Sequence, residues 1–437
     1  MMRSDAHVSR RVFFKGAAVA GAAVVASPYL IPSGVLAAPG RPGANDRIGV
    51  AGIGIGRQGT GLVQRAAANS NVRFIGIADV NLPRAVTTAT KLGGIGVQDY
   101  HKILERKDVD AIITATPEHW RAIVCIEACQ AGKDIYAEKP VSLTIREGRL
   151  MVQAARKYHR VFQVGSQQRS QAINCAGAKW IREGGLGKIR KIIVMNYPSP
   201  FNCGLPEEPV PAGLDWDVWC GPTEPVPYHS QLYVPRGKPG WLSFRPYSGG
   251  EMTGWGSHAF DQVQSALGMD ETGPVEVWVE GPQFDPPTIT KPESNKRPNA
   301  ICSQPKVFFR YANGIVMEPG NSPSFGAVFI GEKGRLTIDR GKLLSDPATF
   351  AAEAGHGAPA TESHIENWID CMKSRAKPNA DIEIGHRSAT VCHLGNIARW
   401  TNRRLRWDPV KEVFPDDAEA NTYLDRKRRK PYELPTV

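Results

Sequence analysis

The spacing of apolar positions changes along the chain and divides it into stretches of different character. Between about residues 47 and 164, short apolar runs of strand length alternate with helix-like patterns. The strand-like runs are residues 47–55, 72–80, 111–116, 134–137 and 161–164. Strands that are apolar throughout and alternate with helices predict a parallel sheet buried between helices on both faces.

From residue 188 onward the pattern becomes rich in β-strand signals. The predicted strands, several of them separated by glycine turns, are residues 191–197, 275–280, 307–311, 315–318, 327–330 and 336–338. Two helical patterns follow, at residues 362–375 and 387–403. The stretch 198–246, rich in proline, glycine and aromatic residues, is expected to be an ordered loop that forms a pocket wall.

The first 38 residues have the pattern of an export signal. A basic region containing the pair Arg10-Arg11 precedes an uncharged stretch rich in glycine and alanine, which ends in Ala37-Ala38. The paired arginines resemble a twin-arginine signal, a route that carries folded proteins, often with their cofactor. The alternative is a membrane anchor, but Pro28 and Pro32 interrupt the stretch. We expect export to the periplasm by the twin-arginine route, with no membrane span in the mature form.

Composition and charge exclude several classes of protein. With 437 residues, 41% of them hydrophobic, the chain is long enough for two globular domains. Residues 1–38 and 425–430 together carry seven of the eleven excess positive charges, so we expect no nucleic-acid partner. The segment 425–430 is expected to be a basic stretch exposed on a docked tail. The eight cysteines follow no zinc-site spacing, and we expect no metal site.

A glycine-rich turn after the first predicted strand indicates a dinucleotide site. Gly54, Gly56 and Gly59 fit the pattern G-x-G-x-x-G, with Arg57 and Gln58 between the last two glycines. The three glycines permit the tight turn, the approach of a pyrophosphate, and the packing of helix on strand. Asp79 follows at the end of the second strand, where a carboxylate can bind both ribose hydroxyls. No cation directly follows Asp79, which favours NAD over NADP as the cofactor.

Several segments resemble the Gfo/Idh/MocA oxidoreductase family. They are residues 114–140 (TATPEHWRAIVCIEACQAGKDIYAEKP), 163–170 (QVGSQQRS), 249–261 (GGEMTGWGSHAFD) and 382–394 (IEIGHRSATVCHL). The resemblance implies an α/β fold in two domains. An N-terminal Rossmann domain with a doubly wound parallel sheet, residues 46–166, would bind NAD. A substrate-binding α+β domain with an open, mostly antiparallel sheet and C-terminal helices would follow, over residues 167–437.

The resemblance also implies a catalytic pair. Lys139 would point at the reacting hydroxyl and favour the developing alkoxide through its charge. His258 would be the general acid and base. The family pattern has an aspartate four residues before this histidine, where this chain has Gly254. Either another group replaces the missing carboxylate, or the acid–base chemistry is altered.

Further contacts follow from the resemblance and from position in the predicted fold. The expected cofactor contacts beyond the glycine turn are Thr116, Pro117, His119 and Glu138. The expected substrate contacts are Gln168, Arg169, Trp255 and Asp261, the last of which could also pair with His258. For Arg169 the alternative is an ion pair, and for Trp255 it is core packing.

These features leave three functions open. The first is an NAD-dependent oxidoreductase that acts on a sugar, polyol or glycoside. The second uses NAD as a recycled group, so that the substrate is oxidised, cleaved or epimerised, and then reduced again. Export favours tightly bound NAD in either case, because the periplasm has no free NAD pool. The third is a sugar-binding protein without catalysis, for which Gly254 is the argument. The resemblance also implies a homo-oligomer.

Overall fold

The structure of the protein is a computed structural model that describes residues 42–43, 46–236, 239–292 and 304–437. The predicted export signal, residues 1–38, lies outside the described residues. Within the part of the chain that is described, no helix has both the length and the apolar character needed to cross a membrane.

The first sheet has six parallel strands in the order β3-β2-β1-β4-β5-β6. The strands are β1 (Ile48–Ile53), β2 (Val72–Ala78), β3 (Ile95–Val97), β4 (Ala111–Thr114), β5 (Asp134–Ala137) and β6 (Phe162–Val164). All four residues of β4 and of β5 are buried, as expected for a parallel sheet covered on both faces. The strand order reverses between β1 and β4, and in sheets of this kind ligands bind at the carboxyl ends of the strands beside that point.

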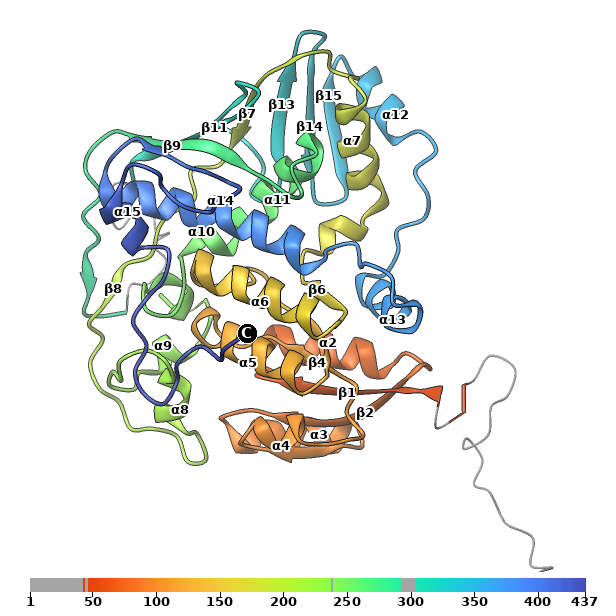
Figure 1. Ribbon diagram of the computed structural model, residues 1–437, viewed down its shortest axis with the longest axis vertical. Helices are drawn as coiled ribbons and strands as arrows, with labels where there is room; N and C mark the ends of the chain where they lie inside the picture. The colour runs from red at the N-terminus through yellow and green to blue at the C-terminus, as the bar shows by residue number, and fades with distance from the viewer. Residues whose placement is uncertain (1–41, 44–45, 237–238, 293–303) are drawn as a thin grey trace, which may run out of the picture. The chain divides into compact units, whose positions relative to one another are not determined.

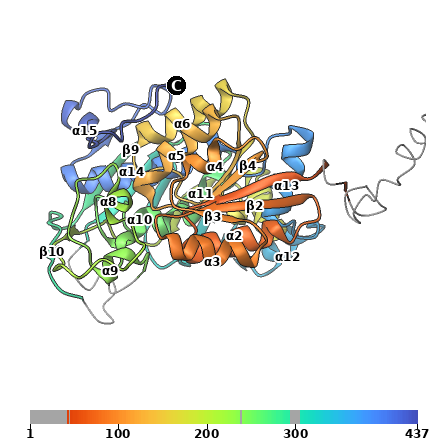
Figure 2. The ribbon, with the colours of Figure 1, turned by 90° about the horizontal axis from the view of Figure 1, so that it is seen from below.

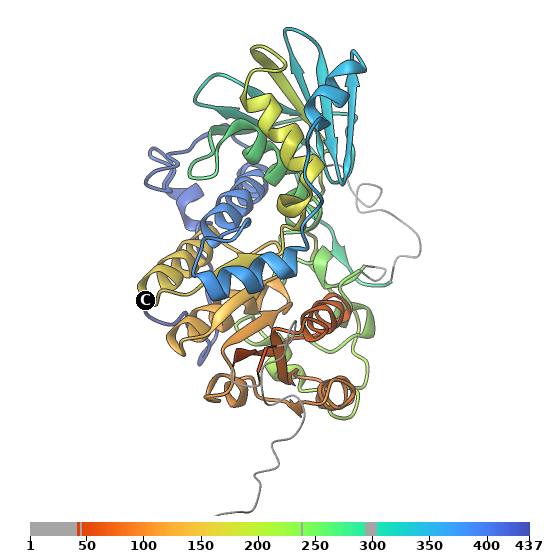
Figure 3. The same ribbon diagram turned by 90° about the vertical axis from the view of Figure 1, so that its right-hand side faces the viewer.

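Helices cover both faces of this sheet (Figure 2). On one face lie α2 (Arg57–Ala67), α3 (Leu82–Lys91) and α13 (His364–Ser374). On the other lie α5 (Glu118–Gln130) and α6 (Ile145–Lys157). Helix α13 comes from late in the chain and is drawn in blue beside the orange and yellow first domain in Figure 3. Its Trp368 is buried in one cluster with Val50 and Val63. The late segment therefore contributes to the core of the N-terminal domain.

The second sheet has eight strands in the order β15-β14-β13-β7-β12-β11-β9-β16. All neighbouring pairs are antiparallel except β7 with β12. Its core packs against α7 (Ala172–Arg182), α11 (Gly256–Leu267) and α14 (Ile382–Thr401), as Figure 1 shows. The predicted fold class is confirmed. The strands are β7 (Ile189–Val194), β9 (Pro274–Glu280), β11 (Lys306–Tyr311), β12 (Val316–Pro319), β13 (Ala327–Gly331), β14 (Arg335–Asp339), β15 (Lys342–Asp346) and β16 (Leu405–Arg406).

The described part of the stretch 198–246, residues 198–236 and 239–246, contains the short helices α8 (Trp216–Cys220) and α9 (Ser230–Tyr233). The smaller elements elsewhere are α4 (His101–Leu104), α10 (Glu251–Gly254), α12 (Thr349–Gly355), α15 (Ala418–Thr422) and the paired strands β8 (Asn202–Cys203) and β10 (Thr288–Ile289).

Helix α14 begins five residues before the predicted helix. Its start is set by Asp381, whose side chain accepts a hydrogen bond from the backbone N–H of Glu383 at 3.1 Å.

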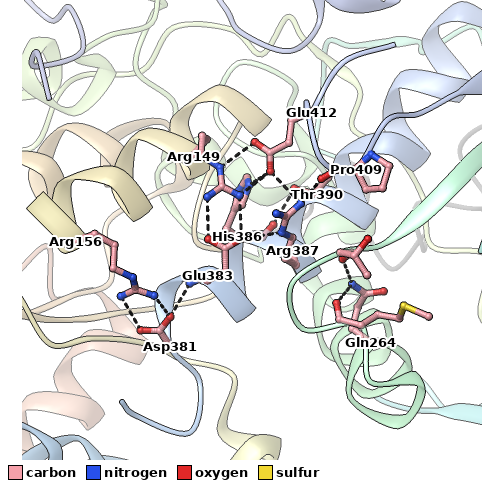
Figure 4. Close-up of polar contacts among 12 residues, drawn as sticks. Arg149, Arg156, Gln264, Asp381, Glu383, His386, Arg387, Thr390, Pro409 and Glu412 are labelled. Atoms are coloured by element: carbon pink, nitrogen blue, oxygen red, sulfur yellow. Dashed lines mark hydrogen bonds and ion pairs between the residues drawn. The ribbon is translucent and has the colours of Figure 1, made fainter. Parts of the chain in front are cut away.

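A network of ion pairs joins α6 of the first domain to α14 and to the loop after β16 (Figure 4). Arg149 binds Glu383 at 2.8 Å and Glu412 at 2.7 Å, and Arg156 binds Asp381. Burial alone would raise the pKa of Glu383 and of Glu412, but these hydrogen bonds and charges lower each to about 2. Both carboxylates therefore stay ionised in neutral solution and hold the two domains together around the sites described below.

The C-terminal tail docks on the first domain, and its basic stretch is only partly exposed, because Lys427 and Lys430 face solvent while the three arginines are half-buried. Glu147 on α6 has a fully buried side chain, which accepts hydrogen bonds from Arg426 Nε and Arg428 Nη2, both at 2.9 Å. Further along, Tyr432 packs edge-on against Trp120 of α5, with ring centroids 5.2 Å apart. The charge of these two arginines is therefore neutralised inside the protein.

Candidate active site

The turn between β1 and α2 has the geometry that its glycines predict. Gly54 has a φ of +67°, and a Cβ there would meet the Cγ2 of Thr116 at 2.4 Å. A Cβ on Gly59 would lie 3.1 Å from the Cβ of Ala115, where helix meets strand. Gly56 caps α2, and the nearest atom to its missing Cβ is the tip of Arg84 at 3.6 Å. The helix N-terminus is therefore open to an anionic group.

A cavity of about 870 Å³ lies against this turn. It has the size of a site for a large ligand. Seven of the predicted cofactor contacts line it: Gly54, Gly56, Arg57, Gln58, Asp79, Thr116 and Pro117. Residues of the 198–246 stretch line the opposite side, among them Trp219, Tyr233 and Trp241, which confirms the prediction that this stretch forms a pocket wall. The open helix end, the carboxylate and the apolar walls fit a dinucleotide.

Asp79 is held in a fixed orientation at the edge of this cavity. Its Oδ2 accepts from the backbone N–H of Ile55 at 3.0 Å, and its Oδ1 accepts from that of Asn81 at 2.9 Å. Burial raises the pKa of Asp79, and Arg84 and the two backbone bonds oppose the rise. Each carboxylate oxygen has a second lone pair for a ligand hydroxyl.

Arg84 is a cavity residue that the sequence analysis missed. Its Nη1 lies 3.9 Å from Asp79 Oδ2, and its guanidinium stands over the ring of Tyr233 at 5.1 Å. The cation that appeared to be absent after Asp79 is therefore supplied from the first turn of α3. The available signal was that Asn81 caps this helix, which places residue 84 one turn along and beside the turn at Gly56.

A smaller cavity of about 270 Å³ adjoins the first. The two share the lining residues Arg57, Gln58, Ala115, Pro235, Arg236 and Trp241. Lys139 lines the smaller cavity just past the carboxyl end of β5, and its Nζ donates to the carbonyl of Gly254 at 2.8 Å. Burial lowers the pKa of Lys139 to about 8, although Glu138 next to it acts in the opposite direction. Lys139 can therefore exchange a proton near neutral pH.

His258 also lines the smaller cavity, but its imidazole is neutral at working pH. Its ring is 5% exposed, and its Nε2 lies 3.2 Å from Arg340 Nη2. Burial lowers the pKa of His258 well below its ordinary value, and the charges of Lys139, Arg340 and Arg236 lower it further. Because Arg340 is a donor at every nitrogen, Nε2 accepts and the ring proton sits on Nδ1.

A carboxylate occupies the space left by Gly254. A Cβ at residue 254 would lie 2.5 Å from Oε2 of Glu251, one helical turn earlier in α10. Arg236 holds the Glu251 carboxylate in place through two hydrogen bonds of 2.9 and 3.1 Å. Another residue therefore brings a carboxylate to the place where the family pattern has an aspartate. The i, i+3 spacing on a helix was the signal that could have found it.

The other predicted contacts divide between the smaller cavity and the core. Glu138 and Trp255 line the smaller cavity, and Glu138 accepts hydrogen bonds from Gln58 and Gln167, both at 3.0 Å. Trp255 also packs against Phe325, with ring centroids 5.3 Å apart. Both side chains are therefore accessible to a ligand of this cavity.

Besides Gly59, which lies where helix meets strand, four predicted contacts lie outside the lining of both cavities. His119 is buried on α5, where its Nε2 bonds the carbonyl of Trp219 at 2.8 Å. Gln168 Nε2 donates to the carbonyl of Phe325 at 2.9 Å. Arg169 and Asp261, both expected to bind substrate, instead form a buried ion pair at 2.9 Å, so Asp261 does not pair with His258. The groups that bond in this way are used inside the wall behind the site, whereas His119 Nδ1 and Gln168 Oε1 are buried there without a hydrogen-bond partner.

Tyr432 is a further cavity residue that the sequence did not reveal. It lines the larger cavity together with Trp120, although it lies in the C-terminal tail.

Within the described residues, no group of three or more histidine, cysteine, aspartate or glutamate side chains could hold a metal ion.

Comparison with protein families agrees with this geometry. Residues 47–166 match an oxidoreductase-family NAD-binding Rossmann fold, and residues 200–434 match an oxidoreductase-family C-terminal α/β domain. The protein is thus an oxidoreductase-family protein with an NAD-binding domain. Both descriptions are those of one family, and the chain belongs to the Gfo/Idh/MocA oxidoreductases.

Individual relatives match over shorter stretches. A levoglucosan dehydrogenase from Pseudarthrobacter phenanthrenivorans is 32% identical over 114 residues, 26% of this chain and 29% of that protein. A glycosyl hydrolase family 109 protein from Shewanella pealeana is 28% identical over 161 residues, 32% of this chain and 35% of that protein. The chain therefore aligns with about a third of the length of these relatives.

Among solved structures, the aldose-aldose oxidoreductase from Caulobacter crescentus, complexed with glycerol, shares the fold. It is 17% identical, with a TM-score of 0.57, over 82% of this chain and 99% of that chain. At this identity the likeness concerns the fold alone.

Proposed function

We propose that this protein is an NAD-dependent oxidoreductase that acts on a CH–OH group of a sugar or polyol. The observation that carries the proposal is the position of Lys139. It lines the smaller cavity, beside the residues that the two cavities share, and its pKa of about 8 suits proton transfer. The dehydrogenase activity in the name of the levoglucosan relative supports the same class of reaction.

The cofactor would lie in the larger cavity. The N-terminus of α2 would face its pyrophosphate, and Asp79 would bind a ribose. When bound, NAD supplies the acceptor for the hydride that leaves the carbinol carbon. The walls of tryptophan and tyrosine would exclude water from that step.

The proton of the reacting hydroxyl goes to Lys139 in this mechanism. The neutral amine of Lys139 accepts the proton as the C–H bond gives up its hydride, so the alcohol becomes a carbonyl. His258 is neutral, and it holds its position by accepting from Arg340 rather than by carrying the proton. The structure thus supports an acid–base role for Lys139, which the sequence assigned to His258.

We further propose that the protein is exported by the twin-arginine route and keeps its NAD tightly bound. The aromatic walls and Tyr432 of the docked tail line the larger cavity and would add contacts that slow the release of the cofactor. A tightly held cofactor must be regenerated on the protein, either by a second substrate or by re-reduction of the first.

Tightly bound cofactor predicts that protein purified without added nucleotide carries about one NAD per chain. The measurement is mass spectrometry of the supernatant after the protein is denatured. Recovery of NADP in place of NAD would contradict the cofactor assignment. Protein recovered empty would contradict tight binding, and a titration with NAD would then show whether the dinucleotide site functions at all.

A second candidate function is favoured by the glycosyl hydrolase relative. In that reaction the substrate is oxidised, its glycosidic bond is cleaved, and the product is reduced again, so NAD shows no net change. Product analysis separates the two functions, because cleavage releases a free aglycone and simple oxidation does not. A purely binding role is less well supported, because the Glu251 carboxylate fills the gap that Gly254 leaves.

The choice of NAD over NADP is expected to depend on Asp79. Replacement by asparagine keeps the shape but removes the charge that binds ribose hydroxyls, so the Kd for NAD should rise about 10- to 100-fold. The affinity for NADP should change little or improve, because Arg84 is then free of its carboxylate partner. Fluorescence titration with each nucleotide checks this, with Arg84→Ala as the variant that should weaken NADP selectively. An unchanged Kd for NAD in Asp79→Asn would remove Asp79 from the site.

A further inference from the structure

Arg340 is a cation in the lining of the smaller cavity, and Asp339 and Glu138 act on it through charge but not through a direct ion pair. Arg340 follows directly after β14, its side chain is exposed, and its guanidinium stands 4.0 Å from the centre of the Phe325 ring. Its hydrogen-bond partner is the neutral ring of His258. Among the described residues, no carboxylate lies within the 4.0 Å of an ion pair with Arg340.

The acids around the cavity are already engaged. Glu251 is bound by Arg236. Glu138 accepts from Gln58 and Gln167. Glu118 accepts from Ser248 at 2.7 Å and from the backbone N–H of Gly249 at 3.0 Å; burial raises its pKa to about 7, so it is only partly ionised near neutral pH.

The cations around the same cavity are less well compensated. Arg57, Lys139, Arg236 and Arg340 all line it, and Arg236 is the one with a carboxylate partner at close range. Burial is the main cause of the lowered pKa of His258, and the charges of Lys139 and Arg340 lower it further, so the ring adds no charge of its own. A cavity that gathers positive charge around a neutral ring favours a ligand that brings a negative charge.

We infer that the smaller cavity takes a sugar acid, with its carboxylate bound by Arg340. The inference rests on the proposed function and names its substrate class. The planar fork of a guanidinium matches a carboxylate through two parallel hydrogen bonds. Arg340 can turn its free N–H groups to the ligand while it keeps its stacking contact with Phe325. Lys139 is then left free to take the proton of a hydroxyl on the same molecule.

A carboxylate fits better than a phosphate. Arg340 offers a single fork, which compensates one negative charge. A phosphate ester carries nearly two charges at neutral pH and three acceptor oxygens, so it needs further donors. Of the other guanidinium groups in the lining, Arg236 is bound to Glu251, and Arg57 stands at the start of α2, beside the proposed cofactor site. Arg121 is buried and already donates to the carbonyls of Pro140 and Thr116.

The test is a binding measurement that needs no turnover. Calorimetric titration of the full chain, saturated with NADH, compares glucuronate, galacturonate, mannuronate and gluconate with glucose, galactose and glucose 6-phosphate. We expect at least one acid to bind about 10-fold or more tightly than its neutral counterpart and than the phosphate. Equal affinity of acids and neutral sugars, preference for the phosphate, or no binding by any acid would each overturn the inference.

Variants assign the preference to Arg340. Arg340→Met should lower the affinity for the acid about 10- to 100-fold and leave that for the neutral sugar unchanged, and Arg340→Lys should lie between the two. Arg335→Met is the matched control, because Arg335 lies on β14 and pairs with Asp346 outside the cavity. If Arg340→Met keeps the preference for the acid, the assignment is wrong. The same acids are then added to protein loaded with NAD⁺, the hydride acceptor. Tight binding of an acid that is neither oxidised nor otherwise converted by the NAD⁺-loaded protein would keep this inference and contradict the proposed function instead.

Discussion

Replacing Lys139 with alanine is expected to lower kcat by about three orders of magnitude while the NAD content of the protein stays the same. The size of the effect is that of removing a positioned general base, together with the charge that favours an alkoxide. The cofactor should remain because Lys139 lines the smaller cavity and is not part of the lining of the larger one. Steady-state kinetics and nucleotide extraction from the same preparation measure both quantities.

A second substitution separates the two roles of Lys139. Lys139→Arg keeps a positive charge but cannot give up a proton near neutral pH. If Lys139 is the base, the arginine variant is as slow as the alanine variant. In the unmodified protein, kcat/KM for oxidation should rise with pH through about 8, because the neutral amine is the active form. A rate that falls through that pH, or an arginine variant with near-normal turnover, would show that only the charge is used.

The second large effect is expected on stability, from Glu147→Ala. This change leaves Arg426 and Arg428 without their buried counter-charge, and the loss of one partner from a buried ion pair costs about 3–5 kcal/mol. Urea unfolding measures the change in the free energy of unfolding. Trypsin should also cut faster within residues 426–430, because the tail is no longer held.

The matched control is Glu105→Ala. Glu105 pairs with Lys102 at 3.8 Å on the surface, where both side chains are more than half exposed, so its loss should change stability by less than about 0.5 kcal/mol. If both variants unfold alike, the Glu147 cluster contributes no special stability. Burial alone would raise the pKa of Glu147, but Arg426 and Arg428 outweigh it and lower the pKa. Its contribution is therefore present above about pH 4.5 and is lost as the pH falls through the lowered pKa.

The parts of the site that could be predicted from the sequence are those fixed by one short stretch of chain. The turn at Gly54 joins one strand directly to one helix, so its glycines have a local meaning. Lys139 follows a strand of a parallel sheet, and the carboxyl ends of such strands meet at one edge. These positions depend little on how distant segments pack.

The parts that escaped prediction depend on segments that meet only after folding. Tyr432 reaches the larger cavity because Glu147 holds the tail, and Arg340 reaches His258 because β14 ends beside α11. His119 and Arg169 show the opposite failure. Each has the chemistry of a ligand-binding residue, but residue type alone does not show that a neighbouring carbonyl or Asp261 already satisfies it.

The position of Tyr432 also bears on when the dinucleotide site comes into existence during synthesis. Its glycine turn and Asp79 leave the ribosome early, and the strands around them can pair as soon as β4 to β6 have emerged. One residue of the cavity lining, Tyr432, is however translated more than 370 residues after Gly56. A nascent chain can therefore form the first sheet long before it can enclose a nucleotide. The lining of the cofactor cavity is therefore complete only after translation has passed residue 432 and the tail has docked.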